Sequence, residues 1–133
     1  MPKERSRPVV SEMQVVTRAA TTAAALLGID DHALAEILGL QEVSVQRMQC
    51  LDHLLEKGSE PFERALLLIG VFRNLHAMGV GEEEAARSWL GRHNRALGAV
   101  PADMIRTRTG LVDVLDYLMS CAAAEDSSGL LPA

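Results

Sequence analysis

Residues that could perform catalysis or bind a metal are scattered along this sequence rather than grouped. The two cysteines, Cys50 and Cys121, lie far apart, and no glycine-rich phosphate loop is present. The histidines show none of the ligand spacings typical of zinc sites, and serines near the C-terminus lack a neighbouring base. We therefore expect a binding protein rather than an enzyme, with no metal and no cofactor. The four histidines are His32, His53, His76 and His93.

Arginines form the first group of residues with a clear chemical meaning. They gather in the C-terminal half, and Asp103 is the one acidic residue that opposes them locally. Such a group is either a solvated face or a contact surface for an acidic partner or phosphate groups. The arginines are Arg87, Arg92, Arg95, Arg106 and Arg108.

Residues 31–50 carry the spacing of a helix-turn-helix. That motif needs a small residue in its first helix, and Ala35 provides it. The turn needs a residue that adopts positive φ, and Gly39 follows four positions later. Val45, six positions further on, can pack back between the two helices.

The second helix of such a motif reads DNA through its exposed face. Glutamine suits adenine edges, and arginine suits guanine or phosphate. The alternative is a purely structural hairpin, because residues 1–50 hold five basic and six acidic side chains. The candidate DNA-binding residues are Gln41, Glu42, Ser44, Gln46 and Arg47.

The elements that position these groups are predicted to be helices alone. Apolar residues make up 48% of the sequence and aromatic residues only 3%, so the core must be aliphatic, which favours helix over strand. Capping residues, glycine stops and apolar spacing predict an all-α fold of seven helices. Their expected ranges are 12–27, 31–38, 41–57, 60–78, 82–91, 101–106 and 109–123.

The chain ends are expected to lack regular structure. Residues 1–10 are basic and contain two prolines, which predicts a flexible arm, with Ser11 capping the first helix. Residues 125–133 predict a flexible tail. No apolar run reaches the roughly 18 residues of a membrane span, and no signal peptide is visible, so we expect a cytoplasmic protein that does not bind membranes. The net charge of −5 argues against nonspecific nucleic-acid binding.

The segment 85–119 resembles the toxin-binding domain of the Xre/MbcA/ParS-like antitoxins. The family pattern is a Trp-Leu pair, an Asn-containing loop ending in Leu-Gly, a Pro-led short helix, and Thr-x-x-Gly before the last helix. Two loop positions depart from it, at His93 and Ala99. The matching residues are Trp89, Leu90, Asn94, Leu97, Gly98, Pro101, Thr107 and Gly110.

The resemblance implies an Xre-like helix-turn-helix domain at 11–58, joined by a long helix to a helical toxin-binding domain at 59–124. It implies an antitoxin of a type II toxin–antitoxin system. Such a protein neutralises a cognate toxin that consumes NAD or transfers ADP-ribose, and it autoregulates its operon by binding operator DNA, here as a homodimer. The alternatives are a stand-alone helix-turn-helix regulator and a helical adaptor. The candidate toxin-binding residues are Trp89, Asn94, Arg95, Arg106, Arg108, Leu130 and Leu131.

Overall fold

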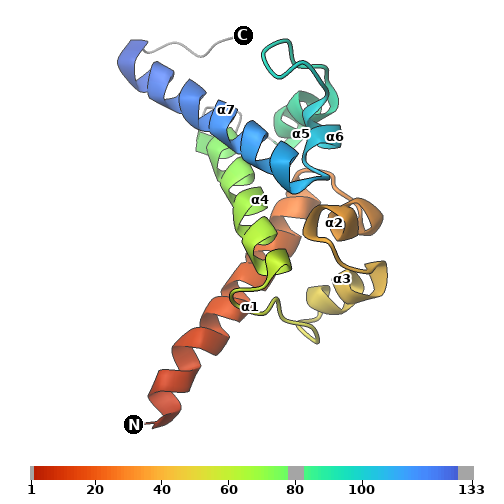
Figure 1. Cartoon of the computed structure of the whole chain (residues 1–133), viewed down its shortest axis with the longest axis vertical. Helices are drawn as coiled ribbons and strands as arrows, with labels where there is room; N and C mark the ends of the chain where they lie inside the picture. The colour runs from red at the N-terminus through yellow and green to blue at the C-terminus, as the bar shows by residue number, and fades with distance from the viewer. Residues whose placement is uncertain (1, 78–82, 129–133) are drawn as a thin grey trace.

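Helices and connecting loops make up the part of the chain that the structure describes, residues 2–77 and 83–128, and no strand occurs within those ranges. The computed structural model therefore confirms the all-α fold class (Figure 1). The helices are α1 (Pro2–Leu26), α2 (Asp31–Leu38), α3 (Glu42–Gln49), α4 (Glu60–Ala77), α5 (Glu83–Gly91), α6 (Pro101–Met104) and α7 (Arg108–Ser128).

Helix α4 is the central element of the fold. It packs against α1, α2 and α7, and Figure 1 shows it between α1 and α7. Ser59 caps its start, because the Phe62 amide donates to Ser59 Oγ at 3.3 Å. A helix with neighbours on several sides needs more than one apolar face, which explains its two-sided sequence pattern. Its buried residues are Phe62, Ala65, Leu68, Val71 and Leu75.

Helices α2 and α3 form the hairpin that the glycine spacing predicts. The side chain of Asp30 caps α2 by accepting from the Ala33 amide at 2.8 Å. Gly39 ends α2 in the left-handed region, with φ of 76°. Val45 of α3 is fully buried, and Ala35 of α2 is 5% exposed, so the two small or branched residues allow the helices to pack.

The connection after α3 is a loop rather than the helical continuation to residue 57 that we expected. Leu51 adopts φ of 61°, and the Asp52 amide donates back to the Arg47 carbonyl, which terminates the helix. The buried hydroxyl of Thr17 in α1 accepts from the Leu55 amide at 2.9 Å. This hydrogen bond fastens the loop to α1.

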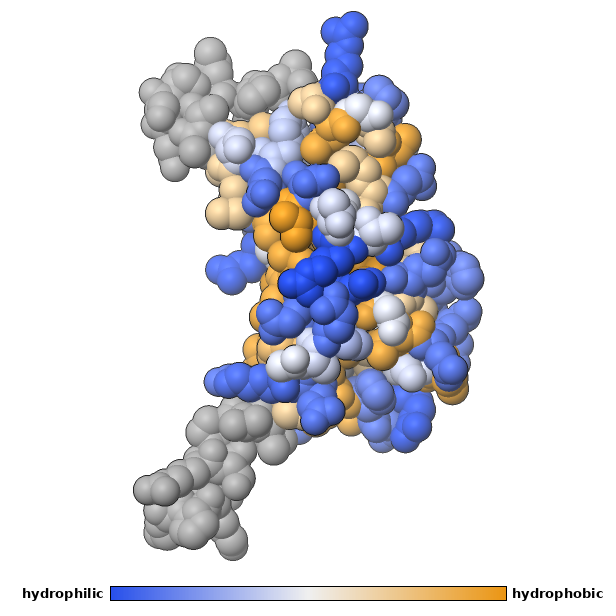
Figure 2. Space-filling model, in the orientation of Figure 1, coloured by the Kyte–Doolittle hydropathy of each residue, from blue (hydrophilic) through white to orange (hydrophobic). Residues whose placement is uncertain are grey.

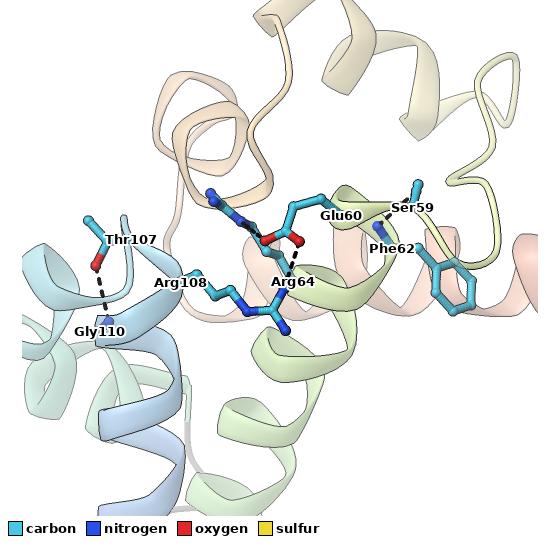
Figure 3. Close-up of polar contacts among 7 residues, drawn as sticks. All are labelled: Ser59, Glu60, Phe62, Arg64, Thr107, Arg108 and Gly110. Carbon is cyan, nitrogen blue, oxygen red and sulfur yellow. Dashed lines mark hydrogen bonds and ion pairs between the residues drawn. The ribbon is translucent and has the colours of Figure 1, made fainter.

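Three arginines join the α5–α7 part of the chain to α1, α2 and the central helix α4. Arg106 donates to Glu36 Oε1 at 3.0 Å, and Arg108 donates to Glu60 Oε1 at 2.6 Å. Glu60 also accepts from Arg64, so one carboxylate holds two cations (Figure 3). Arg87 donates to the last carbonyls of α1, those of Ala25 and Leu26. A cation at this C-terminal end also interacts favourably with the helix dipole.

The expected start of the first helix was wrong. Helix α1 begins at Pro2, so residues 2–10 have helical backbone and Ser11 lies inside the helix. Pro2 is tolerated in a first turn. Pro8 lies beyond it, where a proline has no amide to donate and crowds the carbonyl four residues earlier, so the sequence signal there opposed the helix that forms.

The last helix also runs further than the expected end at residue 123. Helix α7 continues to Ser128, because residues 122–128 contain no glycine or proline and the first helix-breaking residue is Gly129. Part of the expected tail, residues 125–128, is therefore helical. The remainder, residues 129–133, lies outside the described residues.

Candidate functional site

The Thr-x-x-Gly motif fixes the start of α7. The Gly110 amide donates to Thr107 Oγ1 at 3.0 Å, so Thr107 caps the helix (Figure 3). A Cβ atom built on Gly110 would lie 1.7 Å from the Met104 carbonyl oxygen. Only glycine allows the end of α6 to come this close to α7. The cap by Thr107 and the close approach at Gly110 therefore give both residues of the motif a geometric role.

Asn94 closes the loop between α5 and α6. Its backbone amide donates to the Ala99 carbonyl at 2.9 Å, and its carbonyl accepts from the Gly98 amide at 2.8 Å. Its side-chain Oδ1 also accepts from the Leu97 amide at 3.1 Å, as expected for an asparagine cap. Gly98 has φ of 75°, a conformation that favours glycine. The loop is thus held by its own hydrogen bonds.

Trp89 of α5 stacks on Tyr117 of α7. The ring centroids are 6.4 Å apart and the planes differ by 15°. Both rings are half-buried and pack against the core, so each presents one part to solvent. With the α5–α6 loop they line a hollow of 440 Å³, whose other residues are Arg92, His93, Asn94, Arg95 and Ala96.

The rim of this hollow is basic. Arg92, His93 and Arg95 are exposed, and within the described residues neither arginine forms an ion pair. Hydrogen bonding to Cys121 raises the pKa of Tyr117, burial adds to the rise, and hydrogen bonding to Asn94 opposes it. Tyr117 therefore stays neutral at ordinary pH. The site therefore offers cations beside a neutral aromatic face. This arrangement suits a partner whose carboxylates lie next to an apolar or planar group.

The structure brings together three of the predicted toxin-binding residues and separates two others. Trp89, Asn94 and Arg95 share the hollow. Arg106 and Arg108 are engaged in the ion pairs with Glu36 of α2 and Glu60 of α4, so the structure gives them a role in holding the helices together. That they contact a toxin stays a prediction. Leu130 and Leu131 lie outside the described residues.

The predicted DNA-binding residues share the solvent side of α3. Gln41, Glu42, Gln46 and Arg47 are exposed and Ser44 is half-buried. The surroundings include two acidic side chains, those of Glu36 and Glu42. Glu42 lies 3.7 Å from His32, and Glu36 lies 3.4 Å from the same histidine. The side-chain Nε2 of Gln49 donates to Asp31 Oδ1 at 2.6 Å. Arg47 is the one basic residue of α3.

Four residues of the hollow were absent from the predicted toxin-binding set, although one of them, Arg92, belonged to the arginine group noted in the sequence. Tyr117 was missed because its place beside Trp89 depends on how α7 packs against α5. Arg92 and His93 precede Asn94 in the sequence and Ala96 follows it, so the loop motif itself was a signal for them. Proximity to a motif residue would have found three of the four.

These features define a small helical protein with a basic, aromatic surface on its C-terminal domain. Residues 74–123 match the family model of the antitoxin Xre/MbcA/ParS C-terminal toxin-binding domain. The match confirms the resemblance over this segment and supports an antitoxin role. The match does not extend to residues 1–73. No curated protein matches the chain significantly.

Within residues 2–77 and 83–128, no helix is long and apolar enough to span a bilayer. No group of three or more histidine, cysteine or acidic residues is placed there to hold a metal ion.

Proposed function

We propose that this chain is the antitoxin of a type II toxin–antitoxin pair and binds its cognate toxin through the basic hollow. The match of residues 74–123 to a toxin-binding domain carries the proposal. As the resemblance implies, the toxin consumes NAD or transfers ADP-ribose from it, and its binding by the antitoxin blocks that activity in the cytoplasm.

The geometry of the hollow supports this role. The Trp89–Tyr117 pair supplies apolar area that is already ordered, because both rings pack against the core. Arg92 and Arg95 supply cations, and the hydrogen-bonded loop around Asn94 keeps them together. A preformed aromatic anchor with a charged rim is the arrangement typical of energetically important contacts. Leu130 and Leu131 are further candidate contacts.

The test is co-expression with the product of the neighbouring reading frame. The wild-type chain should co-purify with that product and suppress its NAD consumption. The double variant Arg92→Glu, Arg95→Glu should bind about tenfold or more weakly, because it places carboxylates where we expect acidic partner groups. Arg73→Glu, an exposed charge reversal on α4 outside the hollow, is the matched control. Equal binding by the double variant and the control would contradict the proposal.

We also propose that the chain represses its own operon as a homodimer, with α2 and α3 acting as a helix-turn-helix. The left-handed Gly39 and the buried Val45 support this, since the motif needs both. The exposed glutamines and Arg47 are the proposed base and phosphate contacts. Acidic residues around α3 repel DNA phosphates, so α3 can make only a few phosphate contacts. The affinity for operator DNA must therefore come from these few contacts and from dimerisation.

Substitution of α3 separates the two activities. The double variant Gln46→Ala, Arg47→Ala should lose binding to a DNA fragment upstream of the operon and should still neutralise the toxin. The hollow variant should show the reverse pattern. If the α3 variant binds that fragment as tightly as the wild type, α3 does not read the operator. Repression without any toxin partner would favour the stand-alone regulator instead.

A further inference from the structure

A second surface, between α1 and α4, has no role in the proposed toxin contact. It is a groove of 610 Å³, distant in sequence from the hollow. Its apolar lining residues are the more buried Val16 and Phe62 and the exposed Val15 and Leu66. Val15 is 65% exposed and Leu66 is 43% exposed, which makes them two of the most exposed large apolar residues described. Neighbouring apolar side chains at such exposure are typical of a contact surface.

Hydrophobic residues extend along the same side of the molecule. Figure 2 shows some of them along the left-hand edge of the body, where α4 lies in Figure 1, and others toward its upper and lower right. Leu66 and the half-buried Ile69 and Phe72 belong to α4 and contribute apolar area that the described part of the chain does not fully cover. The groove is therefore part of a larger face.

The rim of the groove is acidic. Glu12 and Glu63 border it, and Lys57 pairs with Glu12 at 2.7 Å. Among the described residues Glu63 has no ion pair within 4.0 Å, although Arg108 interacts with it at longer range, so the two carboxylates and one lysine leave the rim with an excess of one negative charge. A basic helix with apolar residues would therefore complement this groove better than an acidic one.

The first turns of α1 have that composition. Residues 2–10 carry Lys3, Arg5 and Arg7 against a single acidic residue, Glu4, followed by two valines. Figure 1 shows the N-terminal part of α1 extending away from the other helices. A projecting helical segment gains stability from tertiary packing on a partner, since short isolated helices are marginal in water.

The projecting segment and one wall of the groove belong to the same continuous helix, α1. A two-fold rotation that lays this segment along the groove of a second copy also returns the second copy's segment to the first groove. We infer that the α1–α4 groove is the surface through which two copies of this chain associate, with the basic start of α1 from each copy lying over the acidic groove of the other.

This inference rests on the proposed homodimer and gives it a location. The experiment is light scattering with size exclusion of the full chain over a range of concentrations. The wild type should reach twice the chain mass of 14.4 kDa. Leu66→Glu places a carboxylate in the groove, and removal of residues 2–10 deletes the proposed occupant. Each change should raise the dimer dissociation constant by about tenfold or more.

Val43→Glu is the matched control, because Val43 is 55% exposed on α3, away from the groove, and should leave the dimer intact. Circular dichroism checks that each variant is folded, and the deletion carries the test if Leu66→Glu is not. A dimer that survives both changes overturns this inference but leaves the proposed dimer standing. A wild type that is monomeric throughout overturns both. Loss of toxin binding by Leu66→Glu in a monomeric chain would assign the groove to the toxin.

Discussion

Gly110 lies against the carbonyl of Met104 so closely that no larger residue fits at that position. A Cβ atom at Gly110 would be 1.7 Å from the Met104 oxygen and 2.5 Å from its carbon. Both of these atoms belong to the backbone, so a rotamer change cannot relieve the overlap. The junction between α6 and α7 therefore depends on this glycine.

We predict that Gly110→Ala destabilises the protein by about 3 kcal/mol or more, because the backbone must move to admit the methyl group. Denaturant unfolding followed by circular dichroism measures the change. Gly91→Ala is the control, since a Cβ there meets nothing within 4 Å and alanine favours helix. Equal stability of the two variants would show that the close approach is absent in solution.

Thr17 tests the attachment of the α3–α4 loop to α1. Thr17→Val keeps the shape of the side chain and leaves the Leu55 amide without its acceptor. We expect a loss of about 1–3 kcal/mol, the cost of an unsatisfied buried donor. Thr22→Val, at an exposed position of α1, should change stability by less than about 0.5 kcal/mol. A Thr17→Val protein as stable as the wild type would contradict the assigned hydrogen bond.

Glu60 predicts a specific dependence of stability on pH. Hydrogen bonds from Arg108 and then Arg64 lower the pKa of Glu60 from its ordinary value of 4.5. A lowered folded-state pKa means that the unfolded chain binds the proton more readily, so the contribution to stability is present above pH 4.5 and is lost as pH falls through the lowered pKa.

The variant Glu60→Gln measures this contribution. Its stability should be below that of the wild type at neutral pH, and the difference should shrink in acid and at high salt, because the ion pairs are exposed. Thermal unfolding of both proteins across this pH range provides the measurement. A difference that is constant with pH would mean that Glu60 does not act through its charge.

Local signals predicted most of the helices. Asp30, Gly39, Ser59 and Pro101 each have a mechanism that starts or stops a helix, and the structure places a helix boundary at each. The errors fell where such signals were weak or misleading. Pro8 did not interrupt α1, and Leu51, which has no intrinsic preference for positive φ, ended the turn after α3.

The site was predictable only in part, because its residues are joined by packing between distant helices. Trp89 and Asn94 were found from a motif, and both lie in the hollow. Tyr117 could not be found in this way, since its partner lies on another helix. The arginines that lie close together in the sequence occupy two different places in the structure. Arg92 and Arg95 border the hollow, whereas Arg106 and Arg108 are tied to carboxylates of α2 and α4.

Hydrogen–deuterium exchange of the chain, alone and bound to the product of the neighbouring reading frame, tests the proposed toxin contact most directly. We predict protection on binding in the segments around the hollow, residues 89–98 and the part of α7 near Tyr117, with little change in α3. Protection confined to α1–α3, with unchanged exchange around the hollow, would contradict the account.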